Sequence, residues 1–227
     1  MDYQALKLSL ILGLYTSLLL IPMGIALAFY LNARGSKQNY IFEAFVTLPL
    51  VLPPTVLGYY LLRGLGQGSW FGHFIQGLTH QSFVFSFSGI LIASIICNIP
   101  FAWLPILRAF EAIPQVLKDA AKTCGLSAWQ ILLKIELPLA WRGILTGFIM
   151  TFTHTLGEFG VVLMVGGNIP NETRTVSIAI YDSMQSLQMD QAGAMALLLL
   201  IISFVALIFT QFFLNRSTST FRQNTPC

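Results

Sequence analysis

Long runs of apolar residues, separated by short polar stretches, dominate the chain. An α-helix needs about 20 consecutive apolar residues to cross the hydrocarbon core of a bilayer. Several runs reach that length, so we predict an all-α membrane protein, a polytopic bundle of about five transmembrane helices. The predicted spans lie near residues 8–31, 44–62, 83–107, 143–165 and 192–213.

Composition agrees with this pattern. Hydrophobic residues make up 56% of the chain and charged residues only 9%, whereas about a quarter of a typical soluble domain is charged. The spans and their connections account for all 227 residues, so we expect one transmembrane domain over residues 1–227. The net charge of +3 is spread thinly, without the basic patch that a nucleic-acid partner would require.

The first two runs carry features that bear on how they cross the membrane. A cleavable signal peptide is an alternative for 8–31, because Ala26-Leu27-Ala28 resembles a cleavage site, but the length of the run and the basic residues after it favour a span. In the second run Pro49, Pro53 and Pro54 each remove an intrahelical hydrogen bond, so we predict a kinked or locally opened helix.

The fourth run is the most polar of the five. It contains Thr151, His154, Thr155 and Glu158. Ionisable groups at membrane depth are costly and face the bundle interior or a water-filled path, although a His and a Glu could also be hydrogen-bonded there for helix packing. Thr151, Thr155 and Glu158 are spaced by four and three residues, so they share one helix face.

One long polar segment, residues 111–138, separates the third and fourth runs. Pro114 suits the first position of a helix and Gly125 the residue just past its end, which predicts a helix from Pro114 to Cys124. Ser127 and Gln130 then form a capping box for a second helix that runs to Leu137.

The first of these helices is amphipathic. Its apolar side chains share one face, formed by Val116, Leu117, Ala120, Ala121 and Cys124. Its polar side chains lie largely opposite, at Gln115, Lys118, Asp119 and Lys122. Such a face suits either a helix seated in a partner's groove or a loop helix folded back on its own bundle.

The spacing of seven residues in this segment is that of a known loop. They are Asp119, Ala120, Ala121, Gly125, Ile135, Leu137 and Pro138. They resemble the Glu-Ala-Ala (EAA) loop of the permease subunits of bacterial ABC importers, with Asp119 in place of the glutamate. The resemblance implies that residues 111–138 form a cytoplasmic loop that docks into a cleft of an ATPase subunit and couples its motion to transport.

A narrower resemblance points to the molybdate-type permeases. It rests on the segments 48–59, 157–160, 168–170 and 173–175. It implies a molybdate importer of the bacterial cytoplasmic membrane, with tungstate or sulfate as the alternative cargo. The expected partners are a second copy of the chain, two cytoplasmic ATP-binding subunits and an external substrate-binding protein.

The distribution of basic residues predicts the orientation. With five spans, nine Lys and Arg residues lie on the side of the 111–138 segment: Arg34, Lys37, Arg108, Lys118, Lys122, Lys134, Arg142, Arg216 and Arg222. Only Lys7, Arg63 and Arg174 lie on the other side. By the positive-inside rule the segment is cytoplasmic, the amino terminus is outside and the carboxyl terminus is inside.

Enzyme signatures are lacking in the sequence. There is no Walker-type loop, no nucleophile elbow and no metal-ligand cluster, and His73 and His80 have no acidic partner nearby. The three cysteines show no disulfide or metal spacing. We therefore expect no catalytic residue, metal or cofactor in this chain, with ATP bound by partner subunits.

The candidate pathway residues are Pro53, Pro54, Thr151, Thr155, Glu158 and Arg174. We expect the prolines to act as hinges, the threonines to form a pathway wall and Arg174 to bias the entrance toward anions. Glu158 would repel a dianion unless it is protonated or paired, with Arg174 or a backbone donor. The rival function is an ion-coupled secondary transporter with His154 and Glu158 as a relay; a purely structural anchor explains neither the polar fourth run nor the loop.

Overall fold

The computed structural model describes residues 2–34, 40–66, 68–70, 72–73, 77 and 83–215. Regular secondary structure in this part of the chain is helical throughout. The elements are α1 (Tyr3–Arg34), α2 (Tyr40–Val51), α3 (Pro54–Leu65), α5 (Phe87–Glu111), α6 (Gln115–Thr123), α7 (Ala128–Ile131), the π-helix η2 (Leu132–Glu136), α8 (Leu137–Gly157), α9 (Gly160–Gly166), α10 (Val176–Gln185) and α11 (Met189–Asn215).

The predicted all-α membrane fold is confirmed. The helices α1, α5 and α11 are each long and apolar enough to cross a bilayer. Two bent pairs, α2 with α3 and α8 with α9, bring the number of spans to five if each pair counts as one. The third span begins at Phe87 and not at residue 83, because the Ser86 side chain caps it by accepting from the Gly89 N–H.

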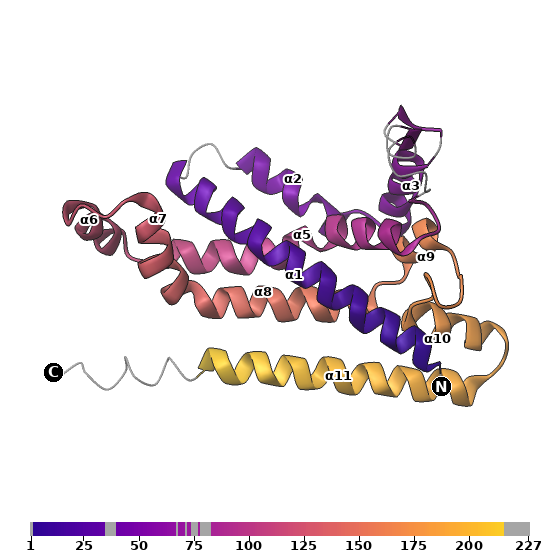
Figure 1. The fold of residues 1–227 in the computed structure, drawn as a ribbon. Helices are drawn as coiled ribbons and strands as arrows, with labels where there is room; N and C mark the ends of the chain where they lie inside the picture. Colours follow the sequence, from indigo (N-terminus) through magenta and orange to yellow (C-terminus); the bar gives the residue numbers. More distant parts are fainter. Residues whose placement is uncertain are drawn as a thin grey trace.

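The bundle is built on α1, α5 and α8, which pack along one another, with α11 beside α8 and α10 (Figure 1). Trp103, Ile106 and Phe110 of α5 are fully buried in this contact. Glycine makes the approach of α8 to α5 possible, since a Cβ added at Gly147 would lie 2.7 Å from the Ala102 carbonyl oxygen. The small α6–α7 unit lies at one end of the bundle and α10 at the other (Figure 1).

The second span is broken, as the prolines predict. Pro53 is the N-cap residue of α3, with φ of −55° and ψ of 135°, Pro54 begins α3, and the axes of α2 and α3 differ by 106°. Helix α3 therefore turns away from α2 and packs on α9 (Figure 1). At Gly58 the contact is close enough that a Cβ would lie 2.8 Å from the Met164 Cβ.

The fourth span is also broken, which the sequence pattern did not predict. Helix α8 ends at Gly157, not at residue 165, and α9 leaves at 63°. Glu158 is extended at the break and no proline is present. The loss of helical bonding is offset locally, because the Ser177 hydroxyl donates to the Leu156 carbonyl at 2.9 Å.

Most of the local structure predicted for residues 111–138 is confirmed. Helix α6 ends at Thr123, and Gly125, just past its C-cap Cys124, has φ of +79°. The Leu126 and Gly125 N–H groups donate to the Ala121 and Lys122 carbonyls, the pattern of a Schellman cap. Ser127 and Gln130 form the predicted capping box.

The predicted end of the second helix at Leu137 is wrong. The chain continues from α7 through η2 into α8, so one bent helix runs from Ala128 to Gly157. Pro138 lies in the first turn of α8, where its ring would collide with a carbonyl of a regular α-helix. In the wider turn of η2 the Leu137 N–H donates to the Leu132 carbonyl oxygen, and this turn accommodates the Pro138 ring.

Candidate functional site

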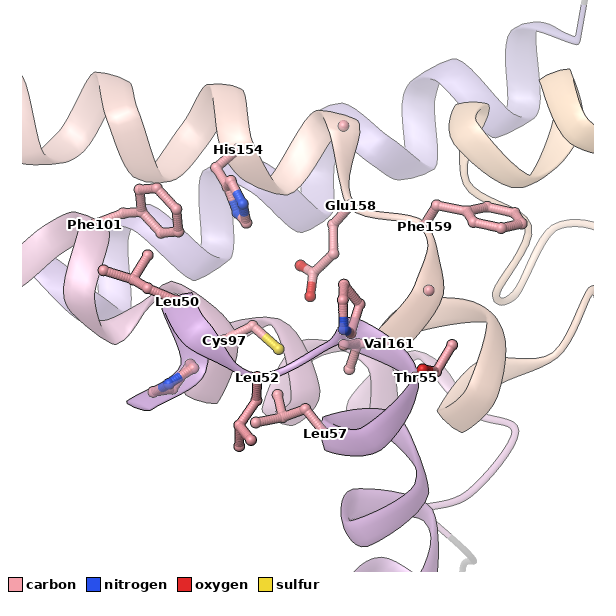
Figure 2. A pocket seen from close by; sticks show the side chains of 14 residues that line it. Leu50, Leu52, Thr55, Leu57, Cys97, Phe101, His154, Glu158, Phe159 and Val161 are labelled. Atoms are coloured by element: carbon pink, nitrogen blue, oxygen red, sulfur yellow. The ribbon is translucent and has the colours of Figure 1, made fainter. Parts of the chain in front are cut away.

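A cavity of about 540 Å³ lies where the two helix breaks face each other. The α2–α3 break contributes Pro54 and Thr55 to its wall, and the α8–α9 break contributes His154 and Glu158. Figure 2 shows the Glu158 carboxylate projecting between His154 and Cys97 toward the side of Leu52. The remaining wall is mostly Leu, Pro, Phe and Val, so a few polar groups are set in an apolar surface.

A buried hydrogen-bonded series joins α5 to the α8–α9 break. The Asn98 amide nitrogen donates to the Ser94 carbonyl at 2.8 Å and to Glu158 Oε2 at 3.2 Å. The Asn98 oxygen accepts from His154 Nδ1 at 2.9 Å, which assigns the proton of that tautomer to Nδ1. The His154 ring stacks on Phe101 with centroids 3.9 Å apart. The sequence gives one hint that Asn98 links these residues: it is a polar residue inside an apolar run.

The electrostatics of the cavity are those of a conduit more than of a tight anion site. Neither Lys nor Arg lines its described wall, and the polar side chains there are the Thr55 hydroxyl, the Cys97 thiol, the His154 ring and the Glu158 carboxyl. A path that must release its cargo requires weak contacts. The cavity volume falls within the range of small-molecule sites.

The threonines predicted as a pathway wall are buried inside the subunit. Thr151 and Thr155 are 0% and 2% exposed, and the Thr155 hydroxyl donates to the Thr151 carbonyl at 2.8 Å. Neither contributes to the cavity wall, in contrast to Glu158 on the same predicted face. Their proposed contact with cargo remains a prediction, as does the hinge role of Pro53 and Pro54.

Of the alternatives considered for Glu158, a pairing with Arg174 is wrong. Arg174 lies just before the start of α10, with its guanidinium 3.9 Å from Asp2 and 3.4 Å from Asp182. Its Nε also donates to the Asn168 side chain at 2.6 Å. Two carboxylates offset its charge, so the structure gives little support to Arg174 as an attractor of anions.

Helix α6 presents its apolar face outward. Val116 is 76% and Leu117 45% exposed, and Ala120 and Cys124 are exposed beside them. Only Ala121 of the apolar set is buried. This orientation contradicts the alternative in which the apolar face folds back on the bundle. It leaves an exposed apolar surface on which a partner could dock.

The EAA-like residues gather at the α6 end of the bundle. Asp119 is exposed and accepts from the Gln115 side chain at 3.0 Å. Ile135 and Leu137 are half-buried along η2 and the start of α8, and Pro138 is exposed. Lys118, expected on the exposed polar face, is instead buried with Glu136 as its partner, because α6 turns that side toward the bundle.

Metal-ligating residues do not gather in the part of the chain that the structure describes. No group of three or more His, Cys, Asp or Glu side chains occurs there. His73 is exposed, whereas His80 and Cys227 lie outside the described residues. Cys97 and Cys124 are free thiols.

The sequence matches one family model over most of its length. The model of the binding-protein-dependent transport system inner membrane component matches residues 20–219. The chain is 40% identical over 206 residues to the molybdenum transport system permease protein ModB of Azotobacter vinelandii, covering 91% of each. It is 30% identical over 212 residues to the probable sulfate transport system permease protein cysT of Chlorella vulgaris, covering 92% of this chain and 79% of that one.

A solved structure shares the fold. It is the crystal structure of a bacterial alginate ABC transporter in complex with an alginate pentasaccharide-bound periplasmic protein, which aligns with a TM-score of 0.74 and 19% identity. The alignment covers 94% of this chain and 78% of that one. At this identity the likeness concerns the fold alone.

Proposed function

Because the chain belongs to the binding-protein-dependent transport system inner membrane component family, we propose that it is the membrane-spanning subunit of an ATP-driven importer that carries molybdate into the cytoplasm. Tungstate and sulfate, which share the tetrahedral oxyanion shape, are the alternative cargoes. The relative named for molybdenum transport is 40% identical to this chain and the one named for sulfate transport is 30% identical, which supports molybdate over sulfate.

The observation that carries the proposal is the outward apolar face of α6. An exposed patch around Val116 and Leu117, at the end of the bundle where basic residues gather, is costly to leave in water and suits a partner's groove. The proposed partner is a cytoplasmic ATP-binding subunit, one for each copy of a homodimer. An external binding protein would deliver cargo at the opposite end, near the amino terminus.

The fold offers a direct mechanical route from that surface to the cavity. The helix from Ala128 to Gly157 begins beside α6 and ends just before Glu158, which lies in the cavity wall. At 1.5 Å per residue it is roughly 45 Å long. Closure of two ATP-bound subunits would move the α6 surfaces together and swing this helix, opening the cavity to the outside as a rigid-body step.

The cavity wall suits a cargo whose affinity is supplied elsewhere. Because the described wall lacks Lys and Arg, a dianion would meet hydroxyl, imidazole and backbone groups and would not be held tightly. The separate binding protein would then supply affinity and selectivity. Glu158 would help to hold the gate in place and would not contact the cargo, which other groups would bind.

The docking surface can be tested by adding charge to it. In the variant Val116→Asp/Leu117→Asp, two carboxylates replace the exposed apolar contact, so we expect an inserted chain that no longer co-purifies with the ATPase. The matched control is Ile169→Asp, an exposed apolar position in the outer loop. Equal ATPase recovery with the double variant and the control would argue against docking through α6.

A further inference from the structure

A buried ion pair holds α6 against the base of α8. The Lys118 ammonium lies 3.0 Å from Glu136 Oε1, and the two side chains are 9% and 5% exposed. The other ion pairs of the described chain are far more open to solvent. For example, α6 carries a second ion pair, between Lys122 and Asp119, whose side chains are 64% and 60% exposed.

Each partner reaches the pair because of local backbone structure. On α6, Lys118 and Ala121 are one turn apart and form the side that faces the bundle. On the other side, Glu136 is the last residue of η2, and the wide turn there sets the direction in which its side chain leaves the helix. A small cavity of about 150 Å³, also lined by Gln115 and Lys122, adjoins the pair.

The hydrophobic effect can contribute little to holding α6 in place. Its large apolar side chains, Val116 and Leu117, point outward, and the buried Ala121 offers only a methyl group. Within the described structure Glu136 Oε2 has no hydrogen-bond partner, so Lys118 is the main compensation for this buried carboxylate. Removal of one partner from a buried pair leaves an uncompensated charge, which is strongly destabilising.

We propose that Lys118 and Glu136 are positioning residues for energy coupling: their ion pair fixes the docking helix α6 to the lower end of α8. A partner that moves α6 then moves α8 with it. If the pair is broken, α6 can shift on its own and the motion is lost before it reaches the cavity. The inference rests on the proposed ATP-driven import and assigns a role to residues outside the EAA-like set.

The test uses the complete complex of permease, ATPase and binding protein in proteoliposomes. The variants are Glu136→Gln, Lys118→Met and the swap Lys118→Glu/Glu136→Lys, and the control Lys122→Met breaks the exposed pair on the same helix. The first readout is molybdate transported per ATP hydrolysed. The second is amide hydrogen exchange over residues 115–124 of the same complexes, which reports how firmly α6 is held.

Both single variants should lower transport per ATP by about tenfold and speed exchange in α6 by a similar factor, because a buried charge loses its partner. ATP hydrolysis itself should continue. The swap should recover most of the coupling, since the attraction is restored with its direction reversed, and Lys122→Met should behave as wild type.

Three results would overturn the positioning role: unchanged exchange in α6, faster exchange with unchanged transport per ATP, or a swap that recovers nothing. If a single variant fails to assemble into the complex, the swap variant decides: in it both assembly and transport per ATP must recover. A wild-type complex that transports without ATP would instead contradict the proposed function, and the exchange data would still decide whether the pair holds α6.

Discussion

The side-chain amide of Asn98 donates a hydrogen bond to Glu158 Oε2 at 3.2 Å, across 60 positions of sequence. It connects the middle of α5 to the point where α8 gives way to α9, on the wall of the cavity between the two helix breaks. Both side chains are buried. A buried polar contact of this kind fixes one arrangement of two helices, which is what a gate requires in each of its states.

Glu158→Leu should therefore impair transport more than it impairs folding. Leucine removes the acceptor for Asn98, and we expect molybdate uptake to fall about tenfold, the equivalent of one lost buried hydrogen bond. Glu158→Gln retains an acceptor and should keep most activity. Uptake by reconstituted complexes is the measurement, with Glu172→Leu in the exposed loop after α9 as control; wild-type uptake by Glu158→Leu would refute the gate role.

The two helix breaks differ in how far sequence could predict them. Pro53 and Pro54 remove backbone donors, so the break of the second span follows from covalent structure. At Glu158 no such constraint exists, and the break depends on bonds from elsewhere, such as those of Asn98 and Ser177. Only the flanking Gly157 and Gly160 gave a signal, and glycine within a membrane helix is too common to identify a break.

Gly125→Val should detach the ATPase while leaving the bundle intact. The residue has φ of +79° with open space around it, so the cost is backbone strain and not a clash. A β-branched residue there costs roughly 1–2 kcal/mol and should unwind the end of α6. Gly125→Asn, which tolerates this conformation, is the matched variant. Co-purification of the ATPase is the measurement, and equal recovery with valine would remove the turn from the docking mechanism.

The loop shows the same division between local and distant causes. Gly125 and the Ser127–Gln130 capping box depend on neighbours within a few residues, and both were predictable. The burial of Lys118 depends on its ion pair with Glu136, and the amphipathic pattern of one helix cannot predict a contact with another helix. Likewise the sequence allows Arg174 as one of several partners for Glu158, whereas folding brings Arg174 to Asp2 and Asp182.

Gly147→Ala should destabilise the contact between α8 and α5. The added Cβ would lie 2.7 Å from the Ala102 carbonyl, a backbone atom that cannot move without its helix. Overpacking of this kind costs about 1–3 kcal/mol. Gly64→Ala in α3 meets no atom within 4 Å and is the matched control. Thermal unfolding in detergent should show a lower midpoint for Gly147→Ala alone; equal midpoints would contradict the close approach.

The orientation can be tested with the native thiol of the loop. In a chain carrying Cys97→Ala and Cys227→Ser, exposed Cys124 should react with a membrane-impermeant reagent only after the membrane is opened. Without Cys124, a cysteine placed at exposed Asn171 should react in intact cells. Labelling of Cys124 from outside would show that the orientation is the reverse of the predicted one, with α6 on the side of the membrane away from any cytoplasmic ATPase.

The most direct test of the central claim is uptake of labelled molybdate by proteoliposomes that contain the complete complex, with ATP inside and the binding protein outside. Uptake should require ATP, should be competed by tungstate and, more weakly, by sulfate, and should ignore an amino acid. Uptake that proceeds without ATP would contradict the ATP-driven importer in favour of an ion-coupled transporter, and uptake of no oxyanion at all would contradict the assigned cargo.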